Sequence, residues 1–239
     1  PLSQEAVDQI IMDTLVCEHS RSEHLSDILY KKTGGNPFFT SEFLKSLYDE
    51  KMILYDYNRK EWKWEIDKIM QHDITDNVVD LMIGKIKKLD PNAQKLCVLA
   101  SCIGNFFDLQ VLSAIYGKSW NETSLDLWPV LEEDLILSVN GAWMSKEAIP
   151  GTDIPKFKFL HDRVQQAAYA MVDEPDKKAI HLQIGRMMLD NLSEDKISEN
   201  IFDLANNLNI GASLVQTFTE KIKIAELNLL AGRKAKSSA

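Results

Sequence analysis

Apolar side chains recur every three or four residues along most of the chain, and this spacing is typical of amphipathic helices with one buried face. The pattern is interrupted repeatedly by Gly, Pro, Asn and Asp, the residues that commonly begin and end helices. The spacing predicts helices over residues 4–15, 22–32, 37–48, 78–89, 93–103, 109–115, 120–134, 164–171, 179–189, 197–208 and 214–231. The chain is therefore expected to be mainly α-helical.

A few short segments alternate polar and apolar residues instead, or are short apolar runs, which is typical of strands. Strands are predicted at Met52–Tyr57, Glu61–Ile66, Leu135–Val139, Ala142–Met144 and Lys156–Leu160. The first two flank Asn58-Arg59-Lys60 and form a predicted hairpin. Asn140-Gly141 is a turn signal before the fourth, and the last can pair back across a loop at 145–155. Trp62 and Trp64 have the same parity on their strand, so we expect both rings to pack on the aromatic-rich helix before them.

Two breaks in the helical pattern carry candidate chemistry. The first is the segment 33–37, TGGNP, where Gly permits a left-handed helix end and Pro37 can occupy the first turn of the next helix. The second is His161-Asp162, where a strand is followed directly by a helix. A helix N-terminus leaves backbone N–H groups unpaired, and its dipole favours anions. His161 is therefore either a buried or capping residue or a donor that reads a phosphate.

The order of these elements predicts four parts. Residues 1–52 form a helical subdomain, 53–75 a β-hairpin and linker, 76–172 a winged-helix domain, and 173–239 the start of a helical region. Helices followed by a hairpin and a further helix are typical of a winged helix. After residue 173 the pattern contains only helices, which indicates the beginning of an α-solenoid of TPR-like character.

Composition and charge narrow the possible partners. The 239 residues carry 36 acidic and 27 basic side chains, and the net charge of −9 argues against a surface that binds polyanions. The candidate recognition helix over 108–116 has no basic residue before Lys118, so DNA binding is disfavoured. No apolar run approaches the ~20 residues of a membrane span. We therefore expect neither a nucleic-acid partner nor a membrane span.

No catalytic or metal-binding motif is recognisable. The sequence contains no GxxxxGK(S/T) phosphate loop, no HExxH and no GxSxG. Its five histidines, at positions 19, 24, 72, 161 and 181, lack the spacing of metal ligands. Cys17, Cys97 and Cys102 fall in apolar helical patterns, which indicates reduced core thiols of a cytoplasmic protein. The chain also lacks an initiator Met and ends in a basic helical segment, so we interpret it as a piece of a larger protein that is not catalytic by itself.

Two motifs together resemble a known family. Gly35-Asn36-Pro37-Phe38-Phe39 resembles the GxP motif of signal-transduction NTPases with numerous domains (STAND proteins), and Phe159-Leu160-His161-Asp162 resembles the MHD motif that ends their winged-helix domain. The segments 74–82, 100–105, 157–169 and 228–236 are similar to the ATPase-like region of large bacterial signalling proteins. Those proteins place a serine/threonine kinase before this region, and a GAF domain and a sensor histidine kinase after it. The resemblance covers essentially the whole chain.

The resemblance implies roles for particular residues. Pro37, with Gly35 in the same motif, would pack against the adenine of a bound nucleotide, and His161 would approach the β-phosphate of ADP. Asp162 would hold the local fold, for instance by capping, and Leu160 replaces the family's Met with a side chain of similar shape. No catalytic residue and no metal ligand is implied in this chain.

The resemblance also implies what lies elsewhere in the parent protein. The nucleotide-binding core, with its phosphate loop and Mg²⁺ aspartate, is expected before Pro1. ATP or ADP with Mg²⁺ is therefore expected in the full-length protein, and no cofactor is expected in this piece alone. The implied partners are that upstream domain and the flanking kinase domains of the same chain, with further proteins binding through the helical region.

Three functions remain open. The first is a regulatory module, a helical lid and winged helix that stay closed around ADP through Pro37 and His161 and open on exchange for ATP. The second is a scaffold that docks other proteins and has no nucleotide role. The third is a winged-helix regulator that binds DNA, for which a salt-dependent interaction with duplex DNA would be required.

Overall fold

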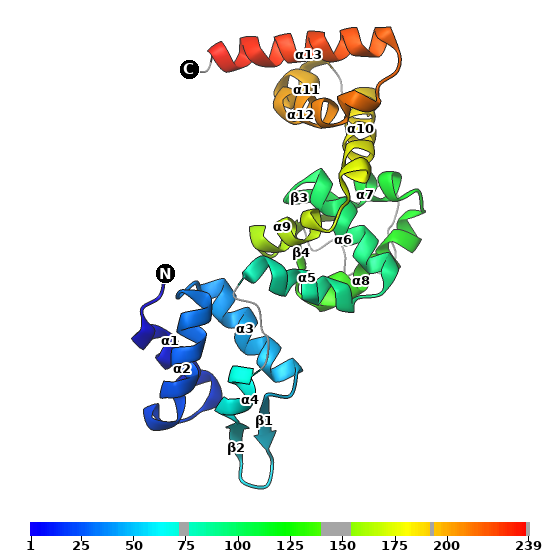
Figure 1. Cartoon of the computed structure of the whole chain (residues 1–239). Coiled ribbons are helices and arrows are strands. Elements are labelled where there is room, and N and C mark those ends of the chain that lie inside the picture. The colour runs from blue at the N-terminus through cyan, green and yellow to red at the C-terminus, as the bar shows by residue number, and fades with distance from the viewer. Residues whose placement is uncertain (72–76, 140–153, 192–193, 238–239) are drawn as a thin grey trace. The chain divides into compact units, whose positions relative to one another are not determined.

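The computed structural model of the chain describes residues 1–71, 77–139, 154–191 and 194–237, and these residues are mainly helical (Figure 1). The predicted class, mainly α with small antiparallel strand pairs, is confirmed. The chain divides into two compact units, Pro1–Gly84 and Lys85–Ala239, with the boundary inside helix α5 (Val78–Lys88). The finer boundaries expected from the sequence, at residues 52, 75 and 172, stay predictions.

The first unit is built from helices and one hairpin. Besides the start of α5, its elements are α1 (Gln4–Leu15), α2 (His19–Thr33), α3 (Pro37–Asp49), β1 (Ile53–Asp56), β2 (Glu61–Trp64) and α4 (Ile66–Gln71). The apolar faces of α1, α2 and α3 meet in one core, in which Val7, Ile11, Leu25, Leu29 and Leu47 are fully buried. Burying such side chains is the main term that stabilises a small helical unit.

Local signals in the sequence set the boundaries of these elements. The Ser3 hydroxyl accepts a hydrogen bond from the Ala6 amide and is the N-cap of α1. β1 and β2 pair in antiparallel register, which confirms the hairpin. The Trp62 ring lies edge-to-face with Tyr48 of α3 at 5.8 Å, and Trp64 packs on the same core. The expected packing on the aromatic-rich helix is therefore confirmed for Trp62.

The second unit surrounds a small sheet with helices. After the end of α5, its elements are α6 (Pro91–Ile103), β3 (Phe106–Asp108), α7 (Leu109–Tyr116), α8 (Trp120–Glu132), β4 (Ile136–Ser138), β5 (Lys156–Phe159), α9 (Asp162–Ala170), α10 (Glu174–Asn191), α11 (Glu194–Glu199), α12 (Ile201–Gly211), a 3₁₀ helix (Ala212–Leu214) and α13 (Phe218–Ser237). The sheet has the order β3-β5-β4, with both pairs antiparallel. Phe157 and Phe159 of β5 are buried and Lys156 is exposed, as the period-two pattern predicted.

Several elements differ from the sequence-based expectation. β3, the short helix α4 and the 3₁₀ helix are not predicted, because segments of three to six residues are too short for a periodicity to show. The helix predicted over 197–208 is two helices that meet at Asn200. Cys17 lies in the loop between α1 and α2 rather than within a helix, because α1 ends at Leu15 with Val16 in a left-handed conformation.

Some predictions fall outside the described residues. These are His72, the turn at Asn140-Gly141, the strand Ala142–Met144 and most of the loop over 145–155. Asn77 is described, and its side-chain oxygen accepts a hydrogen bond from the Val79 amide at 2.9 Å. The Asn77 side chain therefore caps the start of α5.

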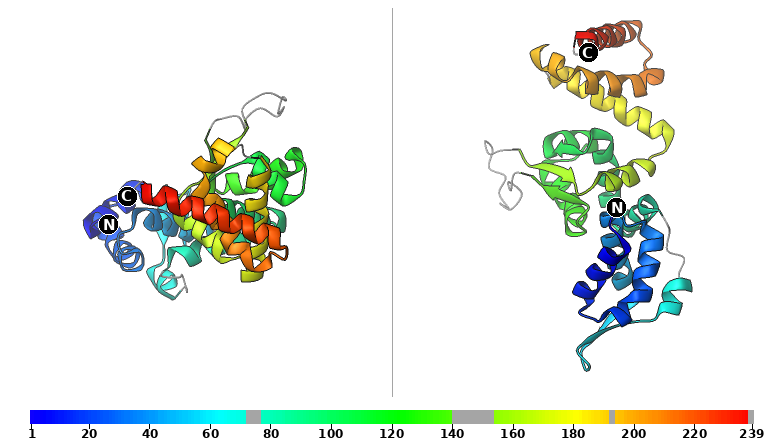
Figure 2. Two further views of the ribbon diagram at one scale, coloured as in Figure 1. Left: turned by 90° about the horizontal axis from the view of Figure 1, so that it is seen from above. Right: turned by 90° about the vertical axis from the view of Figure 1, so that its left-hand side faces the viewer.

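The helices after residue 173 pack in sequence, with α12 between α10 and α13 (Figure 2). Two glycines allow α10 and α12 to approach closely. A Cβ atom on Gly211 would lie 2.5 Å from the Leu182 Cβ and 2.8 Å from the Lys178 carbonyl oxygen. A Cβ atom on Gly185 would lie 2.6 Å from the Leu208 side chain. The α10–α12 contact therefore depends on glycine at both positions.

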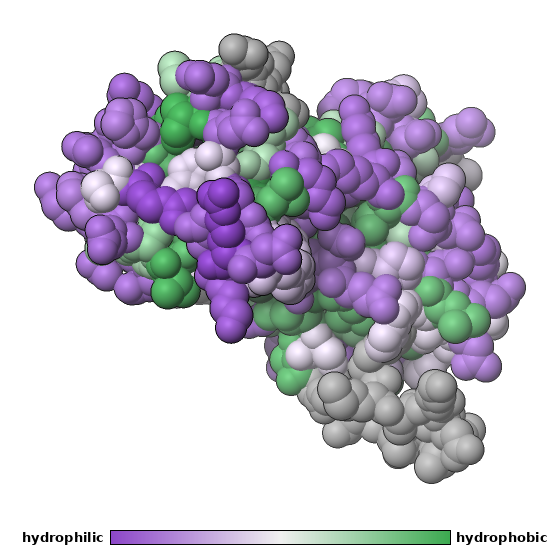
Figure 3. All heavy atoms as spheres, turned by 90° about the horizontal axis from the view of Figure 1, so that it is seen from below, coloured by the Kyte–Doolittle hydropathy of each residue, from purple (hydrophilic) through white to green (hydrophobic). Residues whose placement is uncertain are grey.

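Polar residues dominate the face of the molecule that Figure 3 shows. On the face that Figure 3 shows, hydrophilic side chains cover most of the area and apolar residues form small separate patches. Within the described part of the chain, no helix combines the length and apolar character that a bilayer crossing requires.

Candidate functional site

The Gly35–Pro37 turn joins α2 to α3 in the first unit. Gly34 and Gly35 both have positive φ, +57° and +70°, which ends α2 as predicted. The Asn36 side chain accepts a hydrogen bond from the Phe39 amide at 3.0 Å and is the N-cap of α3, and Pro37 is the first residue of that helix. The predicted position of Pro37 is confirmed.

Gly35 also has a structural reason to be glycine. Its carbonyl accepts a hydrogen bond from the Leu2 amide at 2.6 Å, and a Cβ atom at this position would overlap the Leu2 carbonyl oxygen. The conformation and the close approach are each sufficient to exclude a larger residue. The glycine of this motif can therefore be explained without a ligand, and its part in nucleotide binding stays a prediction.

His161 lies at the step from β5 to α9 in the second unit, as the sequence predicted. It is the N-cap of α9, and its Nδ1 accepts a hydrogen bond from the Arg163 amide at 3.1 Å. A backbone N–H can only donate, so Nδ1 is the acceptor and the neutral ring carries its proton on Nε2. The imidazole side chain is 35% exposed. His161 is therefore a capping residue that is not walled into the interior.

Asp162 does not cap the helix. Its side chain is 88% exposed and lies 3.6 Å from the His161 ring nitrogen, in the first turn of α9. The capping role that the family resemblance suggests for the acidic residue is thus performed by the histidine before it. A carboxylate in a first helical turn still stabilises the helix through the dipole.

The predicted site residues belong to different units. Gly35 and Pro37 share one turn in the first unit, and His161 lies in the second. The described residues contain no group of His, Cys, Asp and Glu side chains that could hold a metal ion. The proposed roles in binding adenine and phosphate stay predictions.

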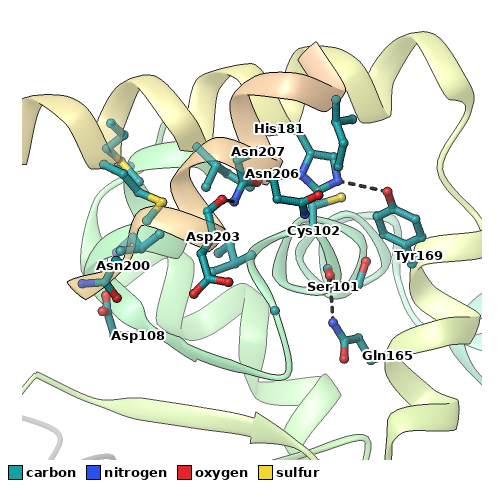
Figure 4. A pocket seen from close by; sticks show the side chains of 18 of the residues that line it. Ser101, Cys102, Asp108, Gln165, Tyr169, His181, Asn200, Asp203, Asn206 and Asn207 are labelled. Carbon is teal, nitrogen blue, oxygen red and sulfur yellow. Dashed lines mark hydrogen bonds between the residues drawn. The ribbon is translucent and has the colours of Figure 1, made fainter. Parts of the chain in front are cut away.

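An open groove of about 1180 Å³ lies within the second unit. The end of α6 forms it together with residues of α7, α9, α10, α11 and α12. Figure 4 shows the side chains of Asp108, Gln165, Asn200, Asp203 and Asn206 around this space. Its lining is rich in amide and carboxylate side chains, with an apolar part that includes Ile184, Met187 and Met188 of α10.

One wall of the groove contains a buried polar network that connects three helices (Figure 4). His181 of α10 lies 3.0 Å from the Tyr169 hydroxyl of α9 through Nε2, and 2.7 Å from the Asn207 Oδ1 of α12 through Nδ1. The Asn207 amide nitrogen donates to the Asp203 carbonyl at 2.8 Å, which fixes the orientation of the amide. The amide oxygen can only accept, so His181 carries its proton on Nδ1 and accepts at Nε2 from Tyr169.

Sequence reasoning did not identify this network. His181 and Asn207 are 5% and 6% exposed, but neither belongs to a recognisable motif. One signal was present: Asn200, Asn206, Asn207 and Asn209 fall in and beside one short helix, although asparagine disfavours helix interiors. In the structure, Asn200 bonds the Lys196 carbonyl, Asn207 bonds His181 and Asn209 bonds Asn228.

The cysteines have structural roles. All three are free thiols, and those of α6 are buried. Burial raises the pKa of Cys97 to about 12 and that of Cys102 to about 11, and it also raises the pKa of Cys17. A thiol with a raised pKa is a poor nucleophile at neutral pH, so none of them is a candidate catalytic group.

The chain is similar to one region of two signalling kinases. It is 31% identical over 276 aligned residues to the "Hybrid signal transduction histidine kinase G" of Dictyostelium discoideum, an alignment that covers 99% of the chain and 8% of that protein. It is 21% identical over 240 residues to the "Peroxide stress-activated histidine kinase mak3" of Schizosaccharomyces pombe, covering 98% of the chain and 10% of that protein.

Neither a family model nor a solved structure matches the sequence. Neither kinase is described by its name as an ATPase, so the STAND assignment stays a prediction. The chain spans a tenth or less of each relative, and nearly all of its own length is aligned with them. Its relatives are histidine kinases of signal transduction, and it corresponds to a single region within each of them.

Proposed function

We propose that the chain is a regulatory nucleotide-sensing module of a STAND-type ATPase within a multidomain signalling kinase. Two observations support this. The relatives are signalling histidine kinases of which this region is a small part. The two motifs that resemble nucleotide contacts each occur where the chain turns into a helix N-terminus, at Pro37 and at His161. By itself the module is not catalytic, and in the parent protein its state would control kinase output.

The arrangement of elements in the second unit supports a winged helix followed by a solenoid. The order α6-β3-α7-α8-β4-β5 is helix, strand, two helices and two strands, which is the order of a winged helix. The helices α10, α12 and α13 then pack one after another. In this interpretation the helix before the β4–β5 pair is α8, not the helix over 108–116, and we propose that these helices begin the TPR-like region.

The proposed mechanism is a two-state switch. With ADP bound, the Pro37 ring would contact the adenine and the His161 ring would approach the β-phosphate, so that both units would hold the closed state. Exchange of ADP for ATP would remove the contacts that are made only in the ADP-bound state. The second unit would then be released. The described residues contain no carboxylate cluster for Mg²⁺, so the metal would be bound by the nucleotide core of the parent protein. The buried free thiols suit a cytoplasmic location.

The observation that carries the proposal is the position of His161, a partly exposed N-cap at the first turn of α9. Its Nδ1 accepts a hydrogen bond from the Arg163 amide, so the proton of the neutral ring lies on Nε2. The positive end of the helix dipole adds to the attraction for an anion.

A series of substitutions in the full-length protein separates phosphate reading from capping. His161→Asp keeps an N-cap acceptor but has no N–H donor, His161→Asn keeps both, and His161→Ala loses both. We expect His161→Asp to release ADP at least about tenfold faster, a loss of about 1.4 kcal/mol, and to raise basal kinase output. His161→Asn should remain close to the wild type. His24→Ala, at an exposed position of α2, is the matched control.

The ADP off-rate, measured with a fluorescent ADP analogue, decides the outcome. If His161→Asp retains ADP and basal output at the wild-type level while only His161→Ala is altered, the histidine acts solely as a cap. The nucleotide role of His161 would then be rejected.

A second function, a scaffold that docks other proteins, is favoured by the groove of the second unit. Binding of DNA is disfavoured by the charge of α8, which contains Glu122, Asp126 and Glu132 but no Lys or Arg. Phosphate contacts require basic residues, so this helix would repel a duplex.

A further inference from the structure

The charges of the groove in the second unit are unbalanced. Three aspartates, Asp108, Asp162 and Asp203, line it together with a single basic side chain, Lys196. The Asp108 carboxylate is occupied, since it accepts a hydrogen bond from the Val111 amide at 2.7 Å. Asp162 and Asp203 are exposed, and among the described residues neither forms an ion pair with a lysine or arginine. The groove therefore offers two carboxylates to a cationic ligand.

The groove also offers carboxamides beside these carboxylates. Asn200, Asp203 and Asn206 follow one another at three-residue spacing at the start of α12, and the Asn200 amide nitrogen donates one hydrogen to the Lys196 carbonyl at 2.9 Å. On another wall of the groove, the amide nitrogen of Gln165 in α9 donates to the carbonyl of Ser101 in α6 at 3.1 Å. A carboxamide has both donors and an acceptor, so one side chain can bind the N–H and the C=O of a peptide backbone together. Several carboxamides in one groove can therefore bind successive peptide groups of a polypeptide backbone.

The apolar part of the groove is adaptable. Ile184, Met187 and Met188 contribute to it from α10, and methionine side chains are flexible and polarisable. They can accommodate apolar side chains of different shapes, as surfaces that bind several peptide sequences do. The combination of an adaptable apolar part with carboxylates and amides fits a polypeptide better than a small rigid ligand.

Two other ligand classes are disfavoured by the same residues. A nucleotide or another phosphate would meet three carboxylates and only one lysine. A sugar would need an aromatic face, but the Tyr169 ring is already packed edge-to-face on His181 at 5.8 Å and has the Lys177 ammonium 4.8 Å from its centre. The groove is therefore distinct in chemistry from the proposed nucleotide contacts.

We propose that this groove binds an extended polypeptide segment that carries lysine or arginine side chains. The carboxylates of Asp162 and Asp203 pair with the basic side chains, the amides of α12 bind the backbone, and the methionines of α10 contact the intervening apolar residues. Binding would connect α9 to α12, and so it would link a partner protein to the helix that His161 caps.

The test uses the 239-residue chain and a short fluorescein-labelled peptide in which every third residue is lysine, the others being serine and alanine. A second peptide has glutamate in place of lysine. We expect the lysine peptide to bind with an affinity that falls as salt is raised, and the glutamate peptide to bind at least about tenfold more weakly. The Asp162→Asn/Asp203→Asn double variant should lose at least about tenfold in affinity for the lysine peptide. The control variant, Asp190→Asn/Glu226→Gln, removes the same charge from exposed positions outside the groove and should bind as the wild type does.

A measurement of the side-chain amides distinguishes a peptide from a simple cation. In NMR spectra, the side-chain amide signals of Asn200 and Asn206 should shift with the lysine peptide and not with lysine amide alone. Added ATP should not displace the peptide, so the result is independent of the nucleotide proposal. No binding of the lysine peptide at millimolar concentration, equal binding of both peptides, or equal loss in both double variants would overturn the inference.

Discussion

Two histidines, one near each end of α9, differ in their exposure and in their hydrogen-bond partners. At the N-terminus of the helix, His161 is partly exposed, and its ring accepts from the backbone two residues further along. Near its C-terminus, the Tyr169 hydroxyl donates to His181, which is buried and also bound to Asn207 of α12. The first ring caps a single helix, and the second connects three.

The difference lies in which nitrogen carries the proton. The neutral His161 ring has its proton on Nε2 because Nδ1 is the acceptor, whereas His181 has its proton on Nδ1 because an amide oxygen faces it. Both nitrogens of His181 are engaged with side chains of other helices, whereas Nδ1 of His161 is engaged with the backbone of its own helix. Burial and these two hydrogen bonds make His181 a structural residue, and the nucleotide role of the partly exposed His161 stays a proposal.

The largest effect is expected from His181→Leu. This substitution leaves the buried Asn207 amide oxygen and the Tyr169 hydroxyl without their partner, which destabilises the second unit by about 3 kcal/mol. Because the chain has two compact units, a whole-chain melting curve mixes two transitions. Hydrogen exchange of peptides from α10 and α12 is the appropriate measurement.

Two further variants make the result specific. Tyr169→Phe removes one hydrogen bond and should destabilise the unit by about 1 kcal/mol. His24→Leu, at an exposed position of the first unit, should leave exchange in α10 and α12 unchanged. A loss below about 1 kcal/mol for His181→Leu would mean that the network contributes little beyond packing.

The distance along the chain between interacting groups decides which features could be predicted from the sequence. The start of α9, the buried face of β5 and the caps at Ser3, Asp90 and Asp108 follow from local patterns, because the groups that interact lie within four residues of each other. The motif positions Pro37 and His161 were found for the same reason.

The network and the groove could not be found in this way. His181 and Asn207 are 26 residues apart, and they meet only because Gly185 and Gly211 let α10 and α12 approach closely. Likewise β3 pairs with β5 across about fifty residues of chain, and a three-residue strand has no periodicity of its own. Contacts that depend on packing between distant helices leave only compositional signals, such as the asparagines of α12.

A smaller effect is expected at His161. Replacing an N-cap by alanine typically costs about 1 kcal/mol, whereas aspartate is itself a good cap. His161→Ala should therefore destabilise the start of α9 by about 1 kcal/mol, and His161→Asp should change it by less than about 0.5 kcal/mol. Hydrogen exchange of the first turn of α9 measures both. Equal destabilisation by the two variants would show that the ring is needed for packing rather than for its acceptor.

The smallest effect is expected at a third histidine, His19, whose contribution to stability depends on pH. His19, at the start of α2, has Nδ1 2.6 Å from the Asp8 carboxylate of α1, and the Ser22 hydroxyl donates to the other carboxylate oxygen at 2.6 Å. The hydrogen bond to Asp8 raises the pKa of His19 above its usual 6.5. The ring is 67% exposed, so solvent weakens the pair, but its charge still depends on pH.

The sign of the pH dependence follows from linkage. The folded chain binds the His19 proton more tightly than the unfolded chain, so the ion pair stabilises the first unit fully below pH 6.5 and ceases to do so as the pH rises through the raised pKa. Hydrogen exchange of α1 and α2 should therefore show a difference between the wild type and His19→Gln that is largest at acid pH and disappears at alkaline pH. His24→Gln on the same helix should show no such trend. A difference that grows with pH would mean that the neutral ring, rather than the ion pair, joins α1 to α2.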